Sequence, residues 1–134
     1  MSLDTRLALF KAVGLVIANY TRPPELSAPG QVLNGSESCE RLRNLGAAVA
    51  QASLLEGATP TLQALILRSS AFMDCFVVTE TSQGPQQVLE GAETWIRLER
   101  LEKAAEDEAE DLVNTKGYSD YMASALRDAE KAQS

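Results

Sequence analysis

Residues 59–78 read TPTLQALILRSSAFMDCFVV, and this stretch decides the fold class. Apolar residues recur in it at the three- and four-residue spacing of a helix that is buried along most of its surface. Thr59 is a good N-cap and Pro60 suits the first helical position, so we expect the helix to begin there. Phe72 should lie in the core. The β-branched end, Val77-Val78-Thr79, is expected to fray.

The same spacing predicts two helices earlier in the chain. One covers residues 4–20, where two apolar stripes lie side by side and imply contact with more than one neighbour. Ile17 lies on the first of these stripes. The other helix covers residues 35–56, with Asn34 as its expected N-cap and Gly57 as its C-terminal stop.

Between these two helices, residues 21–35 read TRPPELSAPGQVLNG and contain three prolines and two glycines. Proline lacks the backbone donor and clashes with the preceding turn, so this stretch cannot form a helix. It is either a loop that packs on its own chain or an arm that docks on a neighbouring subunit. The apolar side chains for either contact are Leu26, Val32 and Leu33.

The longest predicted helix covers residues 86–114, and a docking helix over residues 118–132 follows a break at Gly117. At 1.5 Å per residue the long helix spans roughly 43 Å, so we expect its distal half to project. Its apolar positions form a narrow seam of the width that pairs with a single helix. We expect this seam to bind a partner, together with the arm. The seam residues are Leu98, Leu101, Ala105 and Leu112.

The composition also favours an all-α fold. Alanine and leucine supply 37 of the 134 residues, and hydrophobic residues make up 45% of the chain. A chain of this length can bury a sizeable core as one domain, so we treat residues 1–134 as a single helical domain. We expect an antiparallel bundle of four to five helices without a sheet, in which the long helix has an acidic distal end.

The net charge of −7 lies entirely in residues 68–134, and the chain has no basic footprint for direct nucleic-acid binding. The charge is densest in one acidic run on the long helix. The run is a solvated helix face, a patch for a basic partner, or a calcium or manganese site. The metal site is the weakest alternative, because the looped ligand spacing of an EF-hand is absent. A solvated face predicts that Glu108→Ala is neutral or slightly stabilising, because it relieves like-charge crowding. The run comprises Glu106, Asp107, Glu108, Glu110 and Asp111.

The sequence offers little for catalysis. Histidine is absent, which removes the imidazole as a base, an acid or a metal ligand. Phosphate-binding glycine loops and the G-x-S-x-G elbow are also absent. Cys39 and Cys75 have no C-x-x-C partner, so we expect buried thiols, and whether they pair stays open. We therefore expect a protein that is not an enzyme and that binds no cofactor or metal.

Residues 7–18 read LALFKAVGLVIA, which is too short for a membrane span. Asp4 and Lys11 are out of place in a signal peptide. We therefore expect a protein without either segment, located in the cytoplasm or within an assembled particle.

Two functions remain after these exclusions. The first is a non-catalytic helical assembly or adaptor protein, which acts through protein–protein contacts in a homo-oligomer or a larger particle such as a virion or secretion component. The second is a small acidic regulator or inhibitor that presents its carboxylates to a basic site, as a nucleic-acid mimic does. Salt separates the two, because screening weakens charge contacts much more than apolar docking.

Overall fold

A computed structural model describes residues 3–21, 30–31, 35–78, 84–115, 117–120, 123–124 and 126–127. Most of this part of the chain is helical, which confirms the all-α character predicted from the sequence. The helices are α1 (Leu3–Ala18), α2 (Gly35–Ala52), α3 (Pro60–Met73) and α4 (Gly91–Val113).

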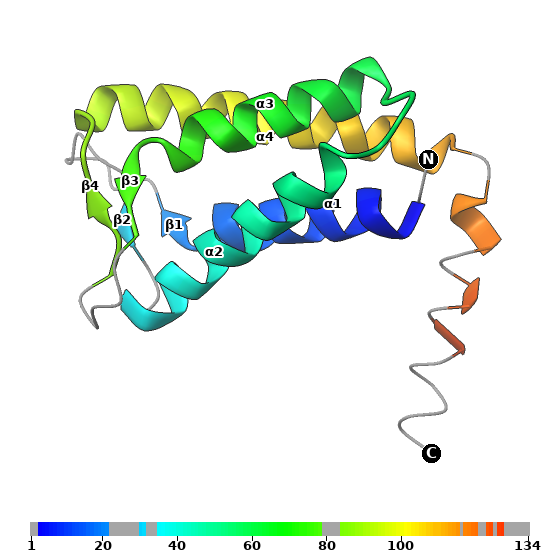
Figure 1. Ribbon diagram of the computed structural model, residues 1–134, viewed down its shortest axis with the longest axis horizontal. Coiled ribbons are helices and arrows are strands. Elements are labelled where there is room, and N and C mark those ends of the chain that lie inside the picture. Colours follow the sequence, from blue (N-terminus) through cyan, green and yellow to red (C-terminus); the bar gives the residue numbers. More distant parts are fainter. Residues whose placement is uncertain are drawn as a thin grey trace.

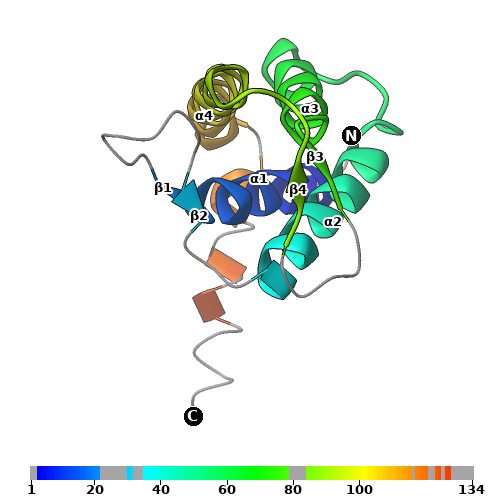
Figure 2. The same ribbon diagram turned by 90° about the vertical axis from the view of Figure 1, so that its left-hand side faces the viewer.

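The four helices pack in two pairs, α1 with α2 and α3 with α4. Figure 1 shows that the members of each pair run in opposite directions, and Figure 2 shows α3 and α4 side by side above α1 and α2. Further contacts join α1 to α4 and α2 to α3, so one apolar core lies between the pairs. Its most buried side chains include Leu9, Val13, Leu65, Phe72 and Leu101.

Four short strands correct the expectation of a structure without a sheet. The strand β1 (Tyr20–Thr21) pairs antiparallel with β2 (Gly30–Gln31), and β3 (Phe76–Val77) pairs antiparallel with β4 (Gln86–Gln87). Aromatic and β-branched residues favour extended backbone, which explains why β3 forms where a fraying helix end was expected. The second pair shortens both neighbouring helices, because α3 ends at Met73 and α4 begins only at Gly91.

The start of α3 is as predicted. The Thr59 hydroxyl accepts a hydrogen bond from the backbone N–H of Leu62 at 3.3 Å, and Pro60 occupies the first turn. The end of α2 differs, because the helix stops at Ala52 and the chain turns before Gly57, which has a φ of 69°. The predicted N-cap Asn34 lies outside the described residues.

The long helix does not project from the body. Its 23 residues span about 34 Å, and α3 and α1 cover it along its apolar side. Six residues of α4 are buried, from its first turn to its last. They are Thr94, Leu98, Leu101, Ala104, Glu108 and Leu112.

Candidate functional site

Two charged side chains occupy core positions at one end of the helical body. On α1, Arg6 continues the buried stripe of Leu9, Val13 and Val16, and it is 0% exposed. On α4, Glu108 occupies the core stripe and is also 0% exposed. A buried charge is costly unless it is paired, so each of these two side chains requires an oppositely charged partner inside the protein.

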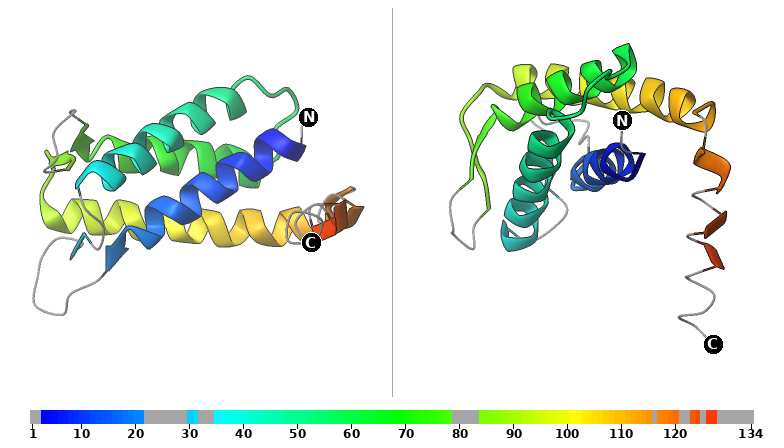
Figure 3. Two further views of the ribbon diagram at one scale, coloured as in Figure 1. Left: turned by 90° about the horizontal axis from the view of Figure 1, so that it is seen from below. Right: turned by 45° about the vertical axis from the view of Figure 1, so that its right-hand side comes forward.

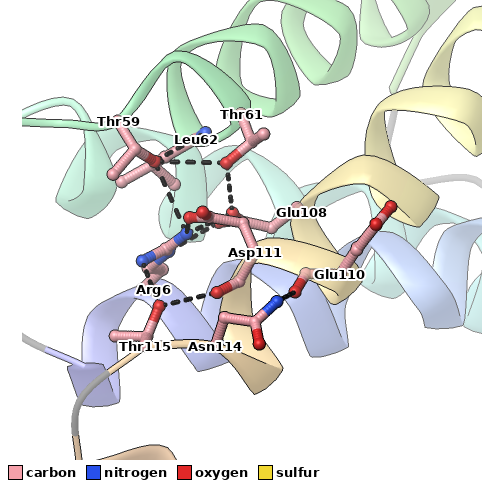
Figure 4. Close-up of polar contacts among 9 residues, drawn as sticks. All are labelled: Arg6, Thr59, Thr61, Leu62, Glu108, Glu110, Asp111, Asn114 and Thr115. Atoms are coloured by element: carbon pink, nitrogen blue, oxygen red, sulfur yellow. Dashed lines mark hydrogen bonds and ion pairs between the residues drawn. The ribbon is translucent and has the colours of Figure 1, made fainter.

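Figure 4 shows how their charges meet. Arg6 donates two hydrogen bonds to Glu108, from Nε to Oε2 at 2.8 Å and from Nη2 to Oε1 at 2.6 Å. The same guanidinium also forms an ion pair with Asp111, one turn further along α4. Such a bidentate geometry makes the contact strong and fixes the orientation of the helices.

Three threonines complete this arrangement, which we call the Arg6 cluster: Arg6, Glu108, Asp111, Thr59, Thr61 and Thr115. Thr61 donates to Oε1 of Glu108 at 3.0 Å, and Thr115 accepts from Nη1 of Arg6 at 3.2 Å. Thr59, the N-cap of α3, lies 3.4 Å from Nη2 of Arg6. The cluster therefore ties the start of α1, the start of α3 and the end of α4 together.

The contacts within the cluster favour the ionised forms of Arg6 and Asp111. The hydrogen bond to Glu108 and the charge of Asp111 raise the pKa of Arg6 above its ordinary value, although burial opposes them. The hydrogen bond from Arg6 lowers the pKa of Asp111. Negative charge at the end of a helix opposes the helix dipole, and Arg6 offsets that cost.

The lowered pKa of Asp111 predicts how stability depends on pH. The ionised carboxylate stabilises the folded state at neutral pH, and this contribution is lost as the pH falls through the folded-state pKa, below 3.8. Between about pH 5 and about pH 2, the wild type should therefore lose more stability than Asp111→Asn. Urea unfolding at several pH values measures this, and parallel losses in the two proteins would contradict it.

The Arg6 cluster divides the acidic run into members with different surroundings. Glu108 is part of the core, which contradicts the interpretation of the run as a uniformly solvated face. Asp107 accepts a hydrogen bond from Lys103 at 3.0 Å, and Asp111 pairs with Arg6. Glu106 and Glu110 are exposed. Only part of the run is therefore available to a basic partner.

An acidic pocket adjoins the Arg6 cluster on the outer side of α3 and α4. It has a volume of about 330 Å³, and its lining residues are Thr61, Asp107, Glu110, Asp111 and Asn114. A second, basic pocket of about 150 Å³ lies on the same two helices, and its lining residues are Arg68, Ala71, Glu93, Arg97 and Arg100. Neither pocket is apparent from the sequence, because the residues that line each one come from two different helices.

Arg97 is held firmly in the basic pocket. Its Nε donates to Glu93 at 3.0 Å, and its Nη1 donates to the backbone carbonyl of Ala71 at 2.7 Å. Neither Arg68 nor Arg100 forms an ion pair with another described residue. The pocket therefore gathers three guanidinium groups around one carboxylate in a chain that is acidic overall.

The predicted partner-binding seam lies in the core instead of on the surface. Leu98, Leu101 and Leu112 are at most 2% exposed, and Ala105 packs against the core. The spacing of the seam was correct, but α3 and α1 cover it, so a partner could reach these leucines only if the core opened. The arm residues Leu26, Val32 and Leu33 lie outside the described residues.

Cys39 and Cys75 are both buried, and they form no disulfide with each other. Burial raises the pKa of Cys75, which keeps the thiol protonated and weakly nucleophilic. Among the residues that the structure describes, no three carboxylate or thiol side chains gather into a metal site. No helix in the same part of the chain is long and apolar enough to span a bilayer.

Comparisons with protein-family models, with curated proteins and with solved structures find no match to this chain. What the site does is therefore inferred from its own geometry and charge.

Proposed function

We propose that this chain is a non-catalytic assembly or adaptor protein that acts through protein–protein contacts in a homo-oligomer or a larger particle. In this proposal, residues 1–134 form one domain, an antiparallel helical bundle with an acidic distal end on α4. At one end of the bundle, the Arg6 cluster joins α1, α3 and α4. Its outer surface and the chain after α4 make the contacts.

The placement of the chain after α4 carries the proposal. Residues 118–120, 123–124 and 126–127 are helical, and Figures 1 and 3 show them outside the body that α1–α4 form. Leu126 is 62% exposed there. Of the described residues in this segment, all but Tyr118 are exposed. A short helix with so little packing is marginally stable in water, and a leucine left in water forgoes about 1.5–3 kcal/mol of burial. Both features favour a segment that docks on a partner.

The alternative function, an acidic regulator of a basic site, rests on Glu106 and Glu110. These two carboxylates are exposed, whereas Arg6 and Lys103 pair with the other members of the run. Two carboxylates make a weak decoy for a strongly basic site. The exposed leucine therefore favours assembly over the acidic alternative.

The test compares the self-association of the 134-residue chain with that of variants substituted at Leu126 or Ser124, in the segment that follows α4. Leu126→Asp should remain folded and should lower the molar mass of the assembly, because it places a charge where an apolar contact forms. Ser124→Asp is the matched control, since it adds the same charge at an exposed position of the same segment without removing an apolar side chain. Sedimentation equilibrium measures both.

Salt distinguishes the two functions in the same experiment. Assembly through Leu126 should persist at about 0.5 M salt, whereas contacts of the exposed carboxylates should weaken steeply. An unchanged mass for Leu126→Asp would contradict docking through this segment.

A further inference from the structure

The outer side of α3 and α4, which we call the α3–α4 flank, carries the basic pocket at one end and the acidic pocket at the other. The α4 residues of the basic pocket, Glu93, Arg97 and Arg100, recur fourteen residues later in the acidic pocket as Asp107, Asp111 and Asn114. Fourteen residues are close to four helical turns, so both sets lie on the same side of α4, about 21 Å apart. On α3, Thr61 and Arg68 are seven residues apart and also share a side.

The two ends of the flank carry opposite charge of equal size. At the basic end, three arginines surround Glu93, which leaves two positive charges. At the acidic end, Lys103 neutralises Asp107, and Arg6 is shared between Glu108 and Asp111. Together with the exposed Glu110, this end keeps two negative charges.

We infer that the α3–α4 flank binds a second copy of this chain across a two-fold axis perpendicular to α4. The inference rests on the proposed function and names its partner. In this arrangement the basic end of each copy faces the acidic end of the other, so Arg68 and Arg100 lie opposite Glu110 of the second copy. A two-fold interface is self-complementary and closes as a dimer.

Charge decides between this arrangement and the parallel one. Two copies placed side by side in the same direction would bring like charges together at both ends, which is costly at an interface. Only the antiparallel arrangement brings the two unpaired arginines of one copy to the exposed Glu110 of the other. The chain carries a net charge of −7, yet one end of this flank is basic.

The centre and the rim of the flank also suit a helix-to-helix contact. Between its charged ends, α3 carries the small, partly exposed residue Ala64, which allows close approach. Leu67, one turn before Ala71, is 63% exposed, and Ile96, one turn before Arg100, is 41% exposed. These two aliphatic side chains supply apolar surface that a second copy would bury.

Charge reversal in the 134-residue chain tests the inference. Arg100→Glu gives a flank that is acidic at both ends, and Glu110→Arg gives one that is basic at both ends. Each variant alone should halve the molar mass of the assembly, with a dissociation constant at least about tenfold higher. An equimolar mixture of the two variants should recover the wild-type mass, because each contact then joins opposite charges again.

Matched controls reverse exposed charges on the other two helices. Lys11→Glu on α1 and Glu40→Arg on α2 should leave the mass unchanged. If the wild type assembles but neither reversal on the flank changes its mass, this inference is wrong and the proposed function stands. Loss of assembly in one reversal only, or failure of the mixture to recover it, overturns the two-fold arrangement. A wild type that stays monomeric overturns the two-fold dimer and the homo-oligomer form of the proposed function.

Discussion

Replacing Glu108 by alanine is expected to lower the free energy of unfolding by about 3–5 kcal/mol, because it leaves the Arg6 guanidinium buried without its main partner. Two hydrogen bonds join the pair at 2.6 and 2.8 Å, and both residues are 0% exposed. A loss of this size is a large fraction of the stability of an ordinary small domain. Urea unfolding followed by circular dichroism measures it.

Glu106→Ala is the control within the same acidic run. Because Glu106 is exposed, its removal should change the free energy of unfolding by no more than about 0.5 kcal/mol. The double variant Arg6→Met/Glu108→Leu should be close to the wild type, since replacing a buried ion pair with apolar residues of similar volume is often neutral. Equal effects of Glu108→Ala and Glu106→Ala would show that the Arg6 cluster does not hold the helices together.

The double variant Leu101→Asp/Leu112→Asp is expected to unfold. Both leucines lie in the core, at 0% and 2% exposure, so each substitution removes buried apolar area and places a carboxylate among apolar side chains. The combined cost should exceed about 5 kcal/mol, enough to unfold a domain of ordinary stability. Circular dichroism should show the loss of helix.

Val113→Asp is the matched control for this pair. It lies next to Leu112 on α4 but is 57% exposed, so the variant should keep its helical spectrum. A seam exposed to a partner, as the sequence predicted, would instead give a folded double variant that no longer assembles. A double variant that stays folded would contradict the core placement of these leucines and would support an exposed docking seam.

Local patterns in the sequence predicted much of the helical fold. Thr59 and Pro60 mark the start of α3 because capping depends on neighbouring residues alone. The three- and four-residue spacing found the core faces of α1, α3 and α4 for the same reason. It could not tell whether the leucines of α4 face another helix of the chain or a partner, since that depends on where α3 and α1 lie.

The Arg6 cluster was missed, although both of its central residues left a signal. Arg6 precedes Leu9, Val13 and Val16 at core spacing, and Glu108 takes the place of an apolar residue between Leu101 and Leu112. A charged residue on each of two buried stripes predicts a buried ion pair. The sequence could not show that Arg6 and Glu108 contact each other, because they are 102 positions apart in the chain. The two pockets of the α3–α4 flank were missed for the same reason.

The short strands show a different limit. Phe76 and Val77 have strong β propensity, but the pairing partners Gln86 and Gln87 have no apolar pattern that would reveal a strand. The helix pattern of α3 therefore extended past its true end at Met73. Pairing with a polar partner strand is decided by backbone hydrogen bonds, which leave no trace in side-chain spacing.

The molar mass of the purified 134-residue chain tests the central claim, self-assembly, most directly. Light scattering at several protein concentrations should give at least twice the 14.4 kDa of one chain, because the α3–α4 flank is inferred to bind a second copy. A mass of 14.4 kDa at every concentration, in low salt as well as in high salt, would contradict the account.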